Sequence, residues 1–533
     1  MLALFRSVAL PTAFLLSCVC SCPYALAQVP GNLSQNKIDI LTRDGDRLAD
    51  QGDYQGALEK YTTAYQGVVS RIRGQAFNSA VPPNIYNRDD LGKEMLRIMA
   101  EEYTDEELEL MDSSYKAFGL VPMDLDCHKL ITQLLTEEVA GFYDPDSKRM
   151  VLIVEDDGPT KDPGWLGRLL GAKPAFDKDE QKTTLAHELT HALQDQLYDL
   201  NALQAGIEKD DDMLTAFSAL VEGDATLLMF AEMGDGQDVS EMDPDAMRAT
   251  FNIMSWLLPF AGGQTYRKAP PIFRDSLTFP YFQGMIFNLT AAGEGGWDRI
   301  HQLYADPPTS TEQVLHPRKY FDREHRDVPQ TVTIPDVQEI VGESWKHLGG
   351  NVLGELQTSI MLKRIPGGKA ASEGWDGDRY EVFKSPDGKL GLLSVSVWDS
   401  PTDAQQFADA YRLYRQPPKS KPIRMNQAKT DSENKAVPET QPVPEKSQAE
   451  TDDAIEPDAI QEELPTVGKQ PATPAIERHI VVELDRVFIV EGFSAAHSAT
   501  LLEKLKESSF AEKVFPMPNG KVQGGDGQKP IQN

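Results

Sequence analysis

The chain has 533 residues, and Asp and Glu outnumber Lys and Arg by 83 to 52, which gives a formal net charge of -31. At roughly 100–200 residues per domain, this length predicts two or three domains with their own cores. The acidic balance argues against nucleic acid or an anionic membrane surface as a partner, because both attract cationic proteins.

The first 27 residues are expected to be an export signal. Arg6 precedes an apolar run from Val8 to Cys20, and Ala25-Leu26-Ala27 fits a cleavage site after Ala27. The run is shorter than the ~20 residues that cross a bilayer, so no membrane span is expected. We therefore predict a secreted or periplasmic protein, with a lipid anchor at Cys18 as the alternative.

Residues 28–75 are predicted to form a helical hairpin. Apolar and small positions recur at helical spacing from Leu33 to Ile72, with a break at Gly52-Asp53. The second half, from Gly52 to Tyr65, resembles one tetratricopeptide-type helix pair. Because about three such repeats are needed to bury a continuous core, one copy indicates a helical cap or a protein-docking element.

Residues 76–340 are expected to fold as one mostly helical domain with a small sheet. A helical stretch is predicted after Pro82-Pro83 and through Ala117. Further on, a turn at residues 144–149 precedes Met150 to Val154, which has the apolar and β-branched composition of a strand. This strand lies some thirty residues upstream of the motif described next.

The motif is His187-Glu188-Leu189-Thr190-His191, on a helix predicted from Asp179 to Leu197. At about 100° per residue, the two histidines fall within about 40° of each other, and Leu185, Leu189 and Ala192 fall on the opposite side. Two imidazoles one turn apart can bind one zinc ion, and the adjacent carboxylate can reach a zinc-bound water as a general base.

A catalytic zinc site needs a third protein ligand. The next predicted helix, Met213 to Met233, carries Glu222 among small residues that allow close approach to the histidine helix. Asp224 is the alternative ligand, or a partner of a zinc-bound imidazole, provided that Gly223 distorts the helix.

These residues resemble the gluzincin branch of the zincin-like metallopeptidases, in which the HExxH motif is followed by a glutamate on a later helix. The resemblance implies one Zn²⁺ per chain, with His187, His191 and Glu222 as ligands and Glu188 as the catalytic base. It also implies that a Tyr or His further along the chain donates a hydrogen bond to the oxyanion. The candidates are His316 as the first choice, with Tyr281 and Tyr320 behind it.

Beyond residue 340 we expect a small α/β domain, formed by residues 341–416 and 475–515. The intervening residues 417–474 are rich in Pro, Glu, Gln and Lys and are predicted to be a disordered insertion. The last residues, 516–533, are predicted to be a disordered tail.

The sequence therefore predicts an α+β protein that is a secreted, zinc-dependent metallopeptidase acting on a peptide or protein. Two alternatives stay open. One is a non-catalytic, zinc-stabilised docking scaffold, and the other is a zinc amidase that acts on cell-wall peptide. The sequence does not identify the substrate or distinguish endopeptidase from exopeptidase activity.

Overall fold

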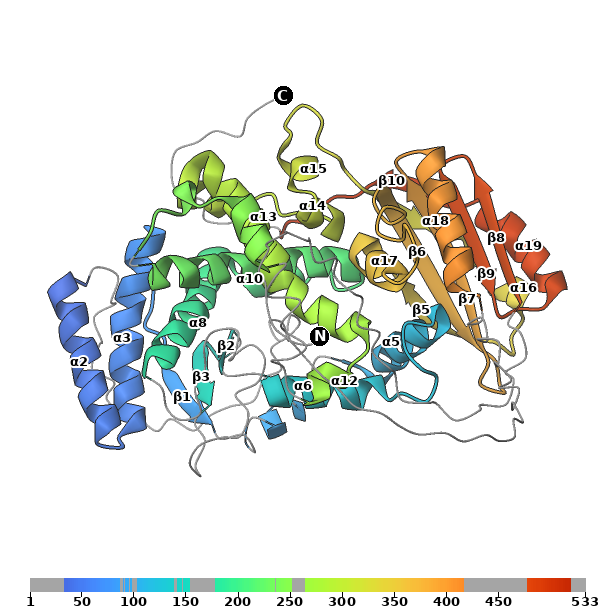
Figure 1. Ribbon diagram of the computed structural model, residues 1–533. Helices are drawn as coiled ribbons and strands as arrows, with labels where there is room; N and C mark the ends of the chain where they lie inside the picture. The colour runs from blue at the N-terminus through green and yellow to red at the C-terminus, as the bar shows by residue number, and fades with distance from the viewer. Residues whose placement is uncertain are drawn as a thin grey trace, which may run out of the picture. The chain divides into compact units, whose positions relative to one another are not determined.

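The computed structural model describes residues 33–86, 103–138, 141–153, 178–251, 264–416 and 477–518, apart from residues 146 and 235, and a few residues between 90 and 97. The expected export signal with Cys18, the expected insertion at 417–474 and most of the expected tail lie outside these residues. Within them the protein is an α+β fold with several small sheets (Figure 1).

The described chain begins with an antiparallel pair of helices, α2 (Gln35–Asp50) and α3 (Tyr54–Arg73). The Asp53 side chain accepts a hydrogen bond from the Gly56 amide and so caps α3. The Tyr61 ring lies so close to Gly45 of α2 that a side chain there would clash. Leu58 and Tyr61 share a hydrophobic cluster with Leu185 and Leu189, so the hairpin is packed against the helix that carries His187, Glu188 and His191.

A three-stranded sheet comes next, in the order β1-β3-β2. Its strands are β1 (Pro83–Tyr86), β2 (Gly141–Asp144) and β3 (Arg149–Ile153), with β3 parallel to β1 and antiparallel to β2. The helical stretch predicted after Pro83 is therefore wrong at its start, because its first three residues belong to β1 and pair with β3. Among the described strands β2 has only β3 as a partner, so it is an edge strand.

Long helices form the largest hydrophobic cluster. They are α5 (Asp105–Phe118), α6 (Cys127–Glu138), α8 (Lys178–Tyr198), α10 (Asp211–Met233) and α13 (Pro271–Leu303), with the shorter α9 (Leu200–Gln204), α12 (Gln264–Lys268), α14 (Thr311–Leu315) and α15 (Pro317–Phe321) and the 3-10 turn η1 (Val239–Glu241). By length and composition α10 could cross a membrane, but 83% of its apolar window is buried inside the protein. It is the central helix of this core.

Helices α10 and α13 cross at very close range. A Cβ atom on Gly223 would stand 2.0 Å from the backbone carbon of Gly284, and one on Gly284 would stand 2.1 Å from the carbonyl oxygen of Ala219. The Asn288 amide donates to the carbonyl of Leu220 at 3.0 Å and so ties the two helices together. Gly223 allows the two helices to approach this closely because it has no side chain, and α10 is continuous through that residue.

The C-terminal part is an antiparallel five-stranded sheet in the order β5-β6-β7-β9-β8. The strands are β5 (Lys346–Asn351), β6 (Trp375–Lys384), β7 (Leu390–Trp398), β8 (Arg478–Glu483) and β9 (Arg486–Glu491). Because side chains alternate along a strand, Val487 and Ile489 face a cluster with α17 (Gly354–Leu362) and α18 (Pro401–Tyr414). Phe488 and Val490 face the other side, with α16 (Gln338–Val341) and α19 (Ala495–Leu505).

Strand pairing joins segments on either side of the domain boundary predicted at residue 340. Strand β4 (Gln330–Thr333), assigned by sequence to the preceding domain, pairs antiparallel with β10 (Ser509–Glu512). Among the described residues, those on both sides of residue 340 cluster into one compact unit.

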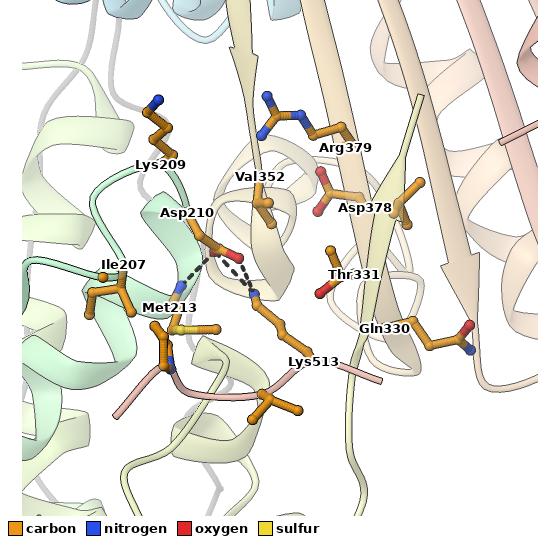
Figure 2. Close-up of a pocket in the computed structure, with 14 residues that line it drawn as sticks. Ile207, Lys209, Asp210, Met213, Gln330, Thr331, Val352, Asp378, Arg379 and Lys513 are labelled. Atoms are coloured by element: carbon orange, nitrogen blue, oxygen red, sulfur yellow. Dashed lines mark hydrogen bonds and ion pairs between the residues drawn. The ribbon is translucent and has the colours of Figure 1, made fainter. Parts of the chain in front are cut away.

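The segment after β10 is fastened to the start of α10. Figure 2 shows the Lys513 side chain reaching Asp210, with its Nζ atom 2.9 Å from a carboxylate oxygen, beside a cavity of about 240 Å³. The same Nζ lies 3.3 Å from Asp212, and the Lys513 side chain is only 2% exposed. Phe515 then packs against Phe217 of α10, so this segment belongs to the largest hydrophobic cluster.

Candidate metal centre

The two histidines and Glu188 project from α8. Leu185, Leu189 and Ala192 on the opposite face are fully buried and hold the helix in the core. The side chains of His187 and His191 are 12% and 13% exposed. The helix thus presents both imidazoles in a mostly enclosed space while its other face is fixed by packing.

Glu222 of α10 meets the two histidines. The Nε2 atoms of His187 and His191 are 3.1 Å apart, and Oε2 of Glu222 lies 3.1 Å from the first and 3.3 Å from the second. The Glu222 side chain is 12% exposed. The three residues that the sequence singled out as ligands therefore bring three potential ligand atoms to one point.

These distances fit a tetrahedral zinc ion. With bonds of about 2.0–2.1 Å, two ligand atoms on a tetrahedron are separated by about 3.3–3.4 Å, close to the observed edges of 3.1, 3.1 and 3.3 Å. Two imidazole nitrogens and one carboxylate oxygen are also a donor set that zinc prefers. The residues present therefore fit zinc, with the fourth position left for water or substrate.

The charges of Glu222 and His191 stabilise each other. Burial alone raises the pKa of Glu222, but the two imidazoles outweigh burial and lower this pKa to about 2. Burial alone lowers the pKa of His191, but Glu222 and the nearby Glu188 outweigh burial and raise it to about 9. Glu222 is therefore an anionic ligand over the whole physiological pH range.

Glu188 is oriented by the edge strand of the small sheet. The backbone amide of Tyr143 in β2 donates to Oε2 of Glu188 at 2.9 Å. Burial raises the pKa of Glu188, and its two histidine neighbours oppose that shift. The Tyr143 hydroxyl donates to Asp195, one helical turn beyond His191, at 2.9 Å. Strand β2 is thus fastened to α8 at two points, one of them the candidate base.

Asp224, the alternative ligand, does not join the triad. It is fully buried, and its Oδ2 accepts hydrogen bonds from Arg73 at 2.9 Å, Gln194 at 3.0 Å and Tyr304 at 2.9 Å. Oε1 of Gln194 lies 2.9 Å from Nδ1 of His191. Because this amide oxygen can only accept, it holds the proton on Nδ1, so the proton that His191 would release on binding a metal is the one on Nε2.

Of the three candidate oxyanion donors, Tyr281 is the one placed at the triad. Its ring stacks on His187, with centroids 6.0 Å apart. Burial, with a smaller effect from Glu222 and Glu188, raises the pKa of the Tyr281 phenol well above its ordinary value. The phenol therefore stays protonated and able to donate.

His316 and Tyr320 lie elsewhere. Nε2 of His316 is 2.9 Å from Oε1 of Glu355, and this pair lines a different cavity. The Tyr320 hydroxyl donates to the backbone carbonyl of Asp306. The structure therefore does not bring the first-choice donor, His316, to the triad.

A second acidic group carries no similar indication of a metal. Glu312, Asp327 and Asp399 also place three carboxylate oxygens close together. The Lys319 ammonium lies 2.6 Å from Glu312 and 2.8 Å from each of the other two. The lysine ammonium already occupies the place between these carboxylates that a cation would take, so we interpret the group as a structural ion-pair cluster.

Sequence reasoning missed three parts of the site: the Tyr143 amide, Gln194 and Arg73. Gln194 was detectable in principle, because a residue three positions after His191 lies on the same helical face. The other two are far in sequence from their hydrogen-bond partners, Tyr143 by 45 residues from Glu188 and Arg73 by 151 residues from Asp224, and no local pattern marks them.

Comparison with known proteins gives one partial match. Residues 343–453 match a family described as a domain of unknown function (DUF8575). No curated protein and no solved structure matches the chain. The matched range begins after Tyr281 and all three residues of the triad, so it carries no information about the metal centre.

Proposed function

We propose that this chain is a zinc-dependent metallopeptidase that is exported and hydrolyses peptide bonds. The observation that carries the proposal is the triangle formed by His187, His191 and Glu222, whose edges match a tetrahedral zinc ion. Its zincin-like catalytic domain comprises the small sheet with α8, α10 and α13. When bound, zinc would act as a Lewis acid. It would lower the pKa of a bound water molecule to near neutral pH and would polarise a carbonyl group.

The protein's own residues supply the remaining chemistry. Glu188 takes a proton from the attacking water and delivers it to the leaving amine. The Tyr143 amide holds one of its carboxylate oxygens, so the other is directed toward the reaction. Gln194 keeps His191 in one tautomer, and Tyr281 donates a hydrogen bond to the oxygen on which negative charge develops.

Digestion of an unbiased peptide library, read by mass spectrometry, tests this function. The wild-type protein should cleave peptides, and Glu188→Gln should keep its zinc while losing at least about a hundredfold in turnover. Metal content is measured on the same two samples. Zinc binding without cleavage by either protein would contradict the peptidase and favour the scaffold, and activity confined to cell-wall peptide would identify an amidase.

A further inference from the structure

A second cavity, of about 590 Å³, lies against a different face of α13 from the metal triad. Asp275, Thr278, Phe279 and Phe282 of α13 line it, and these positions follow the i, i+3, i+4, i+7 spacing of one helical stripe. Tyr281 projects about 110° around the helix from the middle of that stripe. The cavity is therefore distinct from the metal centre, although both use α13.

One part of the cavity lining is apolar. Phe279 and Phe282 come from α13, while Leu356 and Ile360 come from α17. Each of these four side chains is less than 10% exposed, and Phe282 also packs against the ring of Phe251 at 4.8 Å. The cavity volume lies within the range of about 300–1,000 Å³ that is common for small-molecule sites, and its apolar part suits an apolar chain or ring.

The charge that remains unneutralised in the cavity is positive. Its lining has three basic side chains, Arg248, Lys363 and Lys369, and two acidic ones. Asp275 pairs with Lys363 at 2.7 Å, and Glu355 contacts His316 at 2.9 Å. Arg248 differs, because its guanidinium contacts the amide oxygen of Gln283 at 3.3 Å and forms no ion pair with any carboxylate among the described residues.

An arginine beside an amide group provides several donors at one end of the cavity. A guanidinium is always charged and donates in the planar arrangement that matches a carboxylate. The sign of this charge is opposite to that of the protein as a whole, which carries a net charge of -31. A ligand with a negative head group is therefore favoured at this end.

We propose that this cavity binds an organic anion with an apolar body, with its carboxylate at Arg248 and Gln283 and its apolar part against Phe279, Phe282 and Ile360. A fatty acid and the C-terminus of an apolar peptide share this chemistry. The site does not depend on the proposed peptidase activity, because no residue of the metal centre lines it.

Isothermal titration of the purified full chain tests the site with matched probes. Decanoate is compared with decylamine, which has the same chain and the opposite charge, and N-acetyl-Leu-Phe is compared with its C-terminal amide. We expect saturable binding of one molecule per chain by decanoate, by the peptide acid or by both, and at least about tenfold weaker binding of the amine and the amide. The arm that binds more tightly identifies the source of the carboxylate.

Two variants locate the binding in the cavity. Arg248→Gln should weaken binding of the anion about tenfold, and Ile360→Trp should reduce it by filling the apolar end. Arg323→Gln, which removes an exposed arginine outside the cavity, is the matched control and should bind as wild type does. Circular dichroism confirms that each variant is folded. The proposal is overturned if no anion binds at millimolar concentration, if decylamine binds as well as decanoate, or if the folded Arg248 variant binds like the control.

Discussion

Arg73→Met should destabilise the protein strongly, although Arg73 lies more than 100 residues from the zinc-binding motif. The Arg73 guanidinium is 2% exposed and lies 2.9 Å from the fully buried carboxylate of Asp224. Removing one member of a buried ion pair costs about 3–5 kcal/mol, because the other charge is left buried without its partner. Asp224 keeps hydrogen bonds from Gln194 and Tyr304, so we expect the lower end of this range, about 3 kcal/mol.

Urea unfolding, followed by circular dichroism and tryptophan fluorescence, measures this loss. Trp297 is a useful local reporter, because the Arg73 guanidinium lies 4.9 Å from the centre of its ring. Arg71→Met, two residues earlier on α3 and exposed, is the control and should change the free energy of unfolding by no more than about 0.5 kcal/mol. A loss below about 1 kcal/mol for Arg73→Met would refute the view that this pair fastens the N-terminal hairpin to the metal helices.

Three further predictions follow from the metal centre and the core. In competition with a chelator, Glu222→Gln should weaken zinc affinity by tens-fold or more, and Asp224→Asn should weaken it by a smaller factor. A larger loss of zinc affinity for Asp224→Asn would mean that the third ligand is misassigned. Gly223→Ala should lower thermal stability by about 3 kcal/mol or more, because its Cβ would meet Gly284, whereas Gly293→Ala, with open space around it, should be neutral or stabilising. Burial raises the pKa of Asp378 from its ordinary 3.8 to about 6, so its contribution to stability is present below pH 4 and is lost as the pH rises through 6. In urea titrations, the free energy of unfolding of wild type relative to Asp378→Asn should therefore fall as the pH is raised over that range, and a constant difference would contradict the shift.

The histidine helix was accessible to sequence reasoning because its information is local. The spacing of His187 and His191 sets both side chains on one face, and the apolar residues between them set the buried face. The structure has this helix at Lys178–Tyr198, within a residue of the predicted bounds. Glu222 was accessible for a similar reason, since it is an acidic residue among small and apolar residues in the middle of the next helix.

Features that depend on long-range pairing were not accessible. Strand β1 has four residues and gains its partner from β3, more than sixty residues later, so its local pattern was read as a helix. The pairing of β4 with β10 joins segments about 180 residues apart, across the boundary predicted at residue 340. His316 was chosen by analogy with the gluzincins that the motif resembles, and its contact with Glu355 depends on the packing of α17.

The small residues around Glu222 show a related limit. They were interpreted as allowing close approach to the histidine helix. Ala219 and Gly223 instead make room for Gly284 of α13. Sequence identified correctly that this face of α10 is tightly packed, but the identity of the neighbour is a property of the whole fold.

X-ray diffraction from crystals of the purified protein, recorded at the zinc absorption edge, tests the central claim most directly. The account predicts one anomalous peak per chain, about 2.0–2.2 Å from Nε2 of His187, Nε2 of His191 and Oε2 of Glu222. Crystals of protein supplied with zinc that show no peak among these three atoms, or that place the ion at other residues, would contradict it.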